Sequence, residues 1–161
     1  MINQLIQLIS REAVLFESFL DLLEEQKRML VKNDLSGIQT VTEKQRERIV
    51  ESRLLNQQRE ALIGRIKAQN AIDGDLTVTR LLELVDDNQA EQLRRLRDTI
   101  FELNDKIAQT RNSNAMLINQ SRDCIAKTMT MLSHINSPEP NYARTGTSAV
   151  RASSALLDRR A

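Results

Sequence analysis

The side chains that could carry out chemistry are few. The chain of 161 residues contains one cysteine, Cys124, and one histidine, His134. One cysteine cannot form an internal disulfide, and a single histidine beside it falls short of the four ligands of a structural zinc site. As a general base His134 would lack a nucleophile partner, so we interpret it as a cap near the end of a helix. The sequence predicts no catalytic residue, no bound metal and no cofactor.

The charged run EKQRERIVESR at residues 43–53 could bind a polyanion or form a solvated helix face. Its acidic and basic side chains alternate, which favours the solvated face. The whole chain has 23 basic and 22 acidic residues and a net charge of +1. This balance removes the electrostatic reason to expect nucleic-acid binding.

A third group is apolar and lies near the end of the last expected helix. It consists of Met116, Met129, Met131, Leu132 and Ile135. Methionine fills gaps in cores, and it is also over-used at adaptable binding surfaces. Both interpretations stay open; we favour a partner surface, because the preceding helices can cover only part of the long one.

Positioning these groups requires helices. The two prolines, Pro138 and Pro140, both lie near the C-terminus, whereas α/β and all-β domains need frequent Gly/Pro turns. Apolar residues recur instead at steps of three and four. The pattern predicts an all-α fold: an elongated antiparallel helical hairpin or coiled-coil bundle with one long C-terminal helix and a flexible tail.

The helical domain is expected over residues 1–135. Its helices should lie at about 3–32, 35–69, 77–85 and 88–135. Asn33-Asp34 separates the first two and can cap the second, and Asp73-Gly74-Asp75 has turn chemistry. The last helix would span roughly 70 Å and carries a heptad stripe from Leu93 to Ile107.

From residue 136 to 161 the composition shifts to Pro, Gly, Ser and Thr, which predicts a flexible tail. Within the tail, residues 149–159 form an amphipathic segment that places Val150, Leu156 and Leu157 on one potential helical face. We expect this segment to fold when it meets a partner. Tyr142 lies before it and is either simply exposed or an interface anchor.

The N-terminal sequence MINQLIQLISREAVLF has neither a basic start nor an unbroken apolar run. It is therefore expected to be neither a signal peptide nor a membrane span. With one unpaired cysteine the chain fits a reducing compartment, and a cytoplasmic location is predicted.

One family shows a similar order of residues. A run of Leu and Glu at residues 20–27 precedes the step from Leu30 to Asp34, followed by Lys44 ten residues later and Arg59 near the end of the second helix. With the long last helix and the Tyr142-x-x-x-Gly146 pattern in the tail, the chain resembles the FlgN-type flagellar export chaperones over nearly its whole length.

The resemblance implies a cytosolic chaperone of the flagellar type III export system. Such chaperones bind hook–filament junction proteins (FlgK-like and FlgL-like), prevent their premature assembly and deliver them to the cytoplasmic domain of the export gate protein FlhA. We expect substrate contacts at the distal helix and tail: Met129, Leu132, Ile135, Val150, Leu156 and Leu157. Tyr142 is expected to dock the export gate. The alternative is a structural coiled-coil scaffold or tether, whose apolar stripes pair with each other or with another copy.

Overall fold

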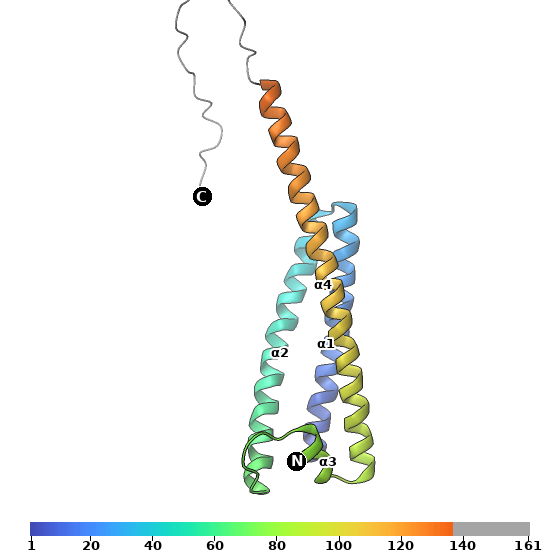
Figure 1. The fold of residues 1–161 in the computed structure, drawn as a ribbon, viewed down its shortest axis with the longest axis vertical. Coiled ribbons are helices and arrows are strands. Elements are labelled where there is room, and N and C mark those ends of the chain that lie inside the picture. Colours follow the sequence, from blue (N-terminus) through green and yellow to red (C-terminus); the bar gives the residue numbers. More distant parts are fainter. Residues whose placement is uncertain (137–161) are drawn as a thin grey trace, which may run out of the picture. The chain divides into compact units, whose positions relative to one another are not determined.

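The computed structural model describes residues 1–136, which fold into four helices without any strand (Figure 1). Their bounds are Ile2–Lys32 for α1, Leu35–Gln69 for α2, Val78–Glu83 for α3 and Asp87–Asn136 for α4. The predicted all-α fold with one long last helix is confirmed. The expected tail and its amphipathic segment at residues 149–159 lie outside the described residues.

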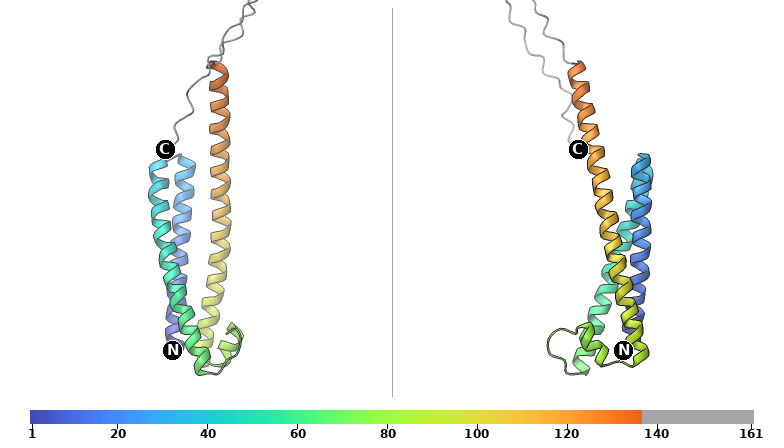
Figure 2. Two further views of the ribbon diagram at one scale, coloured as in Figure 1. Left: turned by 90° about the vertical axis from the view of Figure 1, so that its left-hand side faces the viewer. Right: turned by 45° about the vertical axis from the view of Figure 1, so that its right-hand side comes forward.

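The chain divides into two compact units within α4, one over residues 1–123 and one from Cys124 onward. In the first unit α1 and α2 form an antiparallel hairpin. The first part of α4 runs alongside α1 in the same direction (Figures 1 and 2). Among the described helices, none has an apolar stretch that could cross a membrane.

The hairpin turn between α1 and α2 is short and well capped. Asn33 adopts the left-handed conformation, with φ of 54°, which asparagine tolerates better than most residues. Asp34 is the N-cap of α2, where its Oδ1 accepts a hydrogen bond of 2.9 Å from the Gly37 amide. A Cβ atom on Gly37 would lie 2.7 Å from the Met29 sulfur, so the turn closes most easily around glycine. This turn brings the apolar sides of α1 and α2 together.

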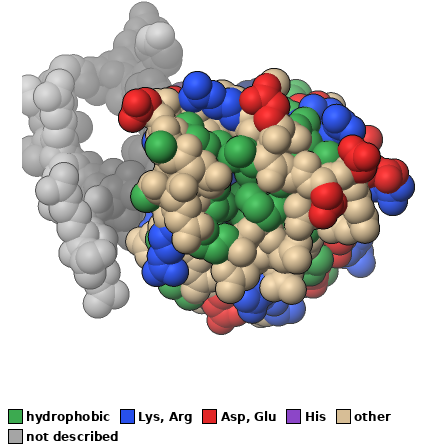
Figure 3. All heavy atoms as spheres, turned by 90° about the horizontal axis from the view of Figure 1, so that it is seen from below, with side chains coloured by type: hydrophobic (Ala, Val, Ile, Leu, Met, Phe, Trp, Pro, Cys, Tyr) green, Lys and Arg blue, Asp and Glu red, His purple; other side chains and the backbone are tan. Residues whose placement is uncertain are grey.

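The apolar core lies at the end of the first unit where α3 crosses between α2 and α4. Its buried members come from all four helices: Leu5, Ile6, Leu62, Ile66, Leu81 and Leu93. Seen from that end, apolar side chains occupy the middle of the surface and charged ones surround them (Figure 3). The short helix α3 therefore serves mainly to contribute Leu81 to this core.

Farther along the bundle, polar residues are buried beside apolar ones such as Leu23 and Val41. Asn114 of α4 is 3% exposed, and its Nδ2 donates to the Leu23 carbonyl at 2.8 Å and to Gln26 Oε1 at 3.0 Å. Gln45 of α2 is also buried and donates to the Leu22 carbonyl. These amides tie α2 and α4 to the same turn of α1, because a hydrogen bond fixes register more strictly than apolar contact does.

One buried carboxyl lies between α1 and α2. Glu12 of α1 is 5% exposed, and its Oε2 accepts a hydrogen bond of 3.0 Å from Nη1 of Arg59 on α2. Burial raises the pKa of Glu12, and the nearby Arg59 guanidinium partly offsets that rise. The pair fixes the orientation of the two helices at mid-length, since an unpaired buried charge would be costly.

Candidate protein-binding surface

The core-facing seam of α4 is made by apolar residues at alternating steps of three and four. They are Leu93, Leu96, Ile100, Leu103 and Ile107. Leu93 and Leu103 are buried, at 4% and 7% exposed. Asn114 occupies the same seam seven residues after Ile107. From Leu93 to Asn114 this side of α4 therefore packs inward.

The same periodicity continues beyond Cys124, where the side chains are exposed. Ile125 lies 18 residues after Ile107, about five helical turns, so it has the same angular position on α4. Met129 and Leu132 follow at steps of four and three. These three residues, named the distal seam below, are 64%, 56% and 52% exposed. The distal seam is thus an apolar stripe that has the periodicity of a packed helix face and that no described residue covers.

The lengths of the helices explain why the distal seam has no described helix packed against it. α4 has 50 residues, whereas α1 has 31 and α2 has 35. At about 1.5 Å per residue neither helix can cover the full length of α4. An uncovered apolar stripe on a helix suits a partner helix or an apolar groove.

The apolar residues that the sequence groups near the end of α4 do not share one face. Met131 is 65% exposed and lies two residues from Met129, about 200° around the helix. Met116, 64% exposed, is also displaced from the distal seam. Of these methionines, Met129 therefore lies on the seam side of α4, and Met131 lies on another side.

Among the predicted contact residues, Met129 and Leu132 lie on α4 within this stripe. Ile135 belongs to α4, but its side chain lies outside the described part. Val150, Leu156 and Leu157 lie outside the described residues, and so does Tyr142. The structure thus places the two predicted contact residues that it describes on one face of α4.

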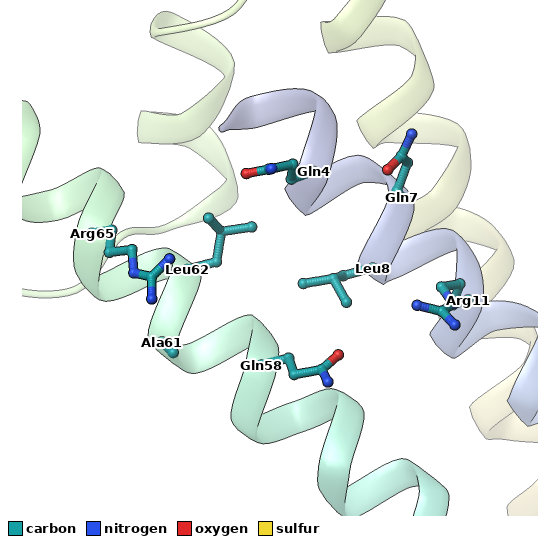
Figure 4. Close-up of a pocket in the computed structure, with 8 residues that line it drawn as sticks. All are labelled: Gln4, Gln7, Leu8, Arg11, Gln58, Ala61, Leu62 and Arg65. Atoms are coloured by element: carbon teal, nitrogen blue, oxygen red, sulfur yellow. The ribbon is translucent and has the colours of Figure 1, made fainter.

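A polar groove between α1 and α2 is a second candidate site. It has a volume of about 390 Å³, and Leu8 and Leu62 point toward one another across it (Figure 4). Its other lining residues supply amide and guanidinium donors or a small methyl: Gln4, Gln7, Arg11, Gln58, Ala61 and Arg65. These donors can hold an anionic or amide-bearing group, but the lining contains no nucleophile or base for catalysis.

The described residues contain no group of three or more His, Cys, Asp or Glu side chains that could hold a metal ion. Cys124 is a free, exposed thiol, and His134 is exposed in the last turn of α4.

Sequence reasoning missed the buried polar residues Glu12, Gln45 and Asn114. The available signals were weak: Asn114 falls on the heptad seam, and Glu12 occurs one residue before the apolar Ala13. Arg59, which the family resemblance singles out, proves to be the partner of Glu12, and Asp34 proves to be the cap of α2. Both matched positions thus have structural roles.

The described residues define an all-α protein whose long last helix carries an exposed apolar stripe. A family model described as "FlgN protein" matches residues 1–149. The chain belongs to the FlgN family, which comprises chaperones of flagellar assembly. No curated protein and no solved structure gives a significant match to the chain.

Proposed function

We propose that this protein is a non-catalytic chaperone in the cytoplasm that binds hook–filament junction proteins, FlgK-like and FlgL-like. It keeps them from assembling prematurely and delivers them to the cytoplasmic domain of the export gate protein FlhA. Membership of the FlgN family supports the chaperone role in flagellar export. The experiments below test whether the partner is a hook–filament junction protein.

The observation that carries the proposal is the exposed distal seam. Ile125, Met129 and Leu132 repeat the spacing by which α4 packs in its first part, yet each is more than half exposed. A subunit held before assembly needs its own apolar helices covered, and an amphipathic helix is a suitable cover. Methionine adds adaptability, because its unbranched thioether side chain can fit more than one substrate surface.

The proposed second contact is the amphipathic segment at residues 149–159, through Val150, Leu156 and Leu157. In this proposal the segment folds against the substrate that α4 has already engaged. Coupled folding and binding gives up part of the interaction energy to ordering, which favours reversible release at the export gate. Tyr142, between the two contacts, is the proposed gate anchor.

The direct test is titration calorimetry of the full chain with a purified FlgK-like protein. Replacing Met129 and Leu132 together with serine is expected to weaken binding at least about tenfold, because two apolar contacts are lost. The thermal unfolding midpoint should stay unchanged, since both side chains are exposed.

Met131→Ser is the matched control, because Met131 is as exposed but faces another side of α4. It should bind like the unmodified chain. Unchanged binding by the double variant would rule out the distal seam as a substrate site. An equal loss in the control would show that the effect is not specific to that face.

The alternative is a structural coiled-coil scaffold whose distal seam pairs with a second copy. Light scattering of the free protein separates the two functions. The scaffold predicts a dimer that the Met129 and Leu132 double variant converts to a monomer, with no heat of binding on adding the junction protein. The chaperone predicts measurable binding and a mass that this double variant leaves unchanged.

A further inference from the structure

A groove with an apolar floor opens between the three long helices of the first unit. It has a volume of about 220 Å³, smaller than the ~300–1,000 Å³ typical of small-molecule sites. Phe16 and Phe19 of α1 line it and are half-buried, and Ile49 of α2 is 42% exposed. Ile107 of α4 lines the groove too. Such a space suits apolar side chains presented by another protein.

The groove exists because α2 and α4 do not pack closely against each other. Among the described helices, the backbones of α1 and α2 approach each other extensively, and α4 does not approach either of them to that extent. Turned by 90°, the ribbon shows α4 standing apart from the α1–α2 hairpin toward the hairpin turn (Figure 2). A bundle of three helices with one open side is completed by a fourth, because ridges of the added helix fit between those already present.

A second hollow extends the first along α2. It shares Phe16, Ser52 and Arg53 with the first, and its volume is about 500 Å³. Together the two hollows follow α2 from Arg48 to Glu60, a rise of about 18 Å. That length matches about three turns of a docked helix.

Every charged residue that lines the smaller hollow is basic, whereas Glu12, Arg59 and Glu60 also line the larger one. The charged residues that line the smaller hollow are Arg48 and Arg53. Arg48 forms a salt bridge of 2.8 Å with Glu51, whereas Arg53 is exposed and forms no salt bridge with a described residue. An exposed arginine beside two aromatic rings is complementary to a carboxylate that flanks an apolar stripe.

We propose that this groove binds an amphipathic helix of a partner protein, with apolar side chains against Phe16 and Phe19 and a carboxylate beside Arg53. The site is separate from the distal seam, so the chain has two docking faces. Charge disfavours its own C-terminal segment as the occupant, because residues 137–161 contain four arginines and only two acidic residues. Half-buried aromatic rings are typical anchors at protein interfaces.

The test uses two synthetic helical peptides with the same leucine stripe, one flanked by glutamates and one by lysines. Fluorescence anisotropy with the full chain is expected to show at least about tenfold tighter binding of the glutamate peptide. Arg53→Glu should remove or reverse this preference. Lys44→Glu is the control on the same helix, since Lys44 is exposed and lines neither hollow, and it should change the preference little.

A second pair of variants tests the floor. Phe19→Ala is expected to weaken binding of the glutamate peptide about tenfold. Ile49→Ser should also weaken binding of this peptide. Because Ile49 is 42% exposed, this variant should fold normally even if Phe19→Ala does not. Val14→Ser, at a 64% exposed position that lines neither hollow, should bind normally.

Equal affinity for the two peptides, or an equal loss in the Val14 and Ile49 variants, would overturn the proposal. Tighter peptide binding by the Leu156→Ala, Leu157→Ala double variant would assign the groove to the chain's own tail instead. If the groove variants changed only the mass of the free protein in light scattering, the occupant of the groove would be a second copy of this chain. The distal seam is intact in all groove variants, so these results are independent of junction-protein binding.

Discussion

Glu12 and Arg59 show how much one buried pair contributes to the α1–α2 hairpin. The Glu12 side chain is 6% exposed and that of Arg59 is 36% exposed, so solvent screens the cation but hardly reaches the carboxyl. Burial raises the pKa of Glu12 while Arg59 lowers it. The ionised carboxyl is therefore tolerated in the hairpin because Arg59 is present.

Arg59→Met is expected to destabilise the protein at neutral pH by about 1–2 kcal/mol, less than the ~3–5 kcal/mol of a fully buried pair. Without its cation the pKa of Glu12 rises further above the ordinary 4.5. A group whose pKa is raised on folding favours the folded state at low pH, and this contribution is lost as the pH rises through the folded-state pKa.

The difference between variant and unmodified chain should therefore be largest near pH 7.5 and should shrink toward about pH 4.5. Urea unfolding at both values measures it. A difference that is constant with pH would mean that Arg59 acts by packing rather than through the Glu12 carboxyl.

A second prediction at this scale concerns Asp34, which caps α2 by accepting a hydrogen bond from the Gly37 amide. Asp34→Ala should lower the free energy of unfolding by about 1 kcal/mol, because the amide loses its acceptor. Asp34→Ser should recover most of the loss, since serine is also a good N-cap. Urea unfolding of both variants and of the unmodified chain measures the change. If Asp34→Ala were as stable as the unmodified chain, the cap would contribute nothing.

At the scale of the element, α4 is held by a polar residue in an otherwise apolar seam. Asn114 donates two hydrogen bonds to α1, but its Oδ1 is buried without a partner among the described residues. An unsatisfied buried acceptor costs about 1–3 kcal/mol. A buried polar residue of this kind lowers the stability of the bundle but fixes the register between the helices.

Asn114→Leu is therefore expected to raise the free energy of unfolding by about 1 kcal/mol, measured by urea denaturation. The exposed Asn112→Leu is the matched control and should change stability little. A clear loss of stability in Asn114→Leu would show that its hydrogen bonds to α1 outweigh the cost of the buried acceptor.

At the scale of the whole molecule, the proposed function separates substrate binding from gate docking. Replacing Leu156 and Leu157 with alanine should weaken junction-protein binding about a hundredfold if both side chains bury on binding, since each contributes ~1.5–3 kcal/mol. Thermal stability should not change. Titration calorimetry measures the affinity, and an unchanged dissociation constant would place the whole substrate contact on α4.

Tyr142→Ala should leave junction-protein binding intact and impair docking of the loaded complex to the cytoplasmic domain of FlhA. The reason is that Tyr142 lies before Gly146 and outside the amphipathic segment, where its ring can meet a separate apolar pocket. Both binding steps are measured with the same variant. Loss of substrate binding alone, or of neither step, would contradict separate roles for the two parts of the tail.

The sequence by itself determined the all-α class and the long last helix. Helices depend on hydrogen bonds between residues four apart and on apolar spacing, and both are local properties of the chain. The Asp34 cap and the Asp73–Asp75 break are local as well, so they are visible without any tertiary contact. The same locality makes the heptad stripe of α4 readable from Leu93 to Ile107.

Only the tertiary structure decided which parts of the α4 seam are covered. Leu103 and Leu132 have the same periodic position, yet one is buried and the other is exposed, because cover comes from residues far away in the sequence. The partners of Glu12 and Asn114 lie 47 and 91 residues distant, so no local pattern reveals them. The groove over Phe16 and Phe19 likewise depends on the spacing of α1, α2 and α4, which is a property of packing between helices rather than of any one helix.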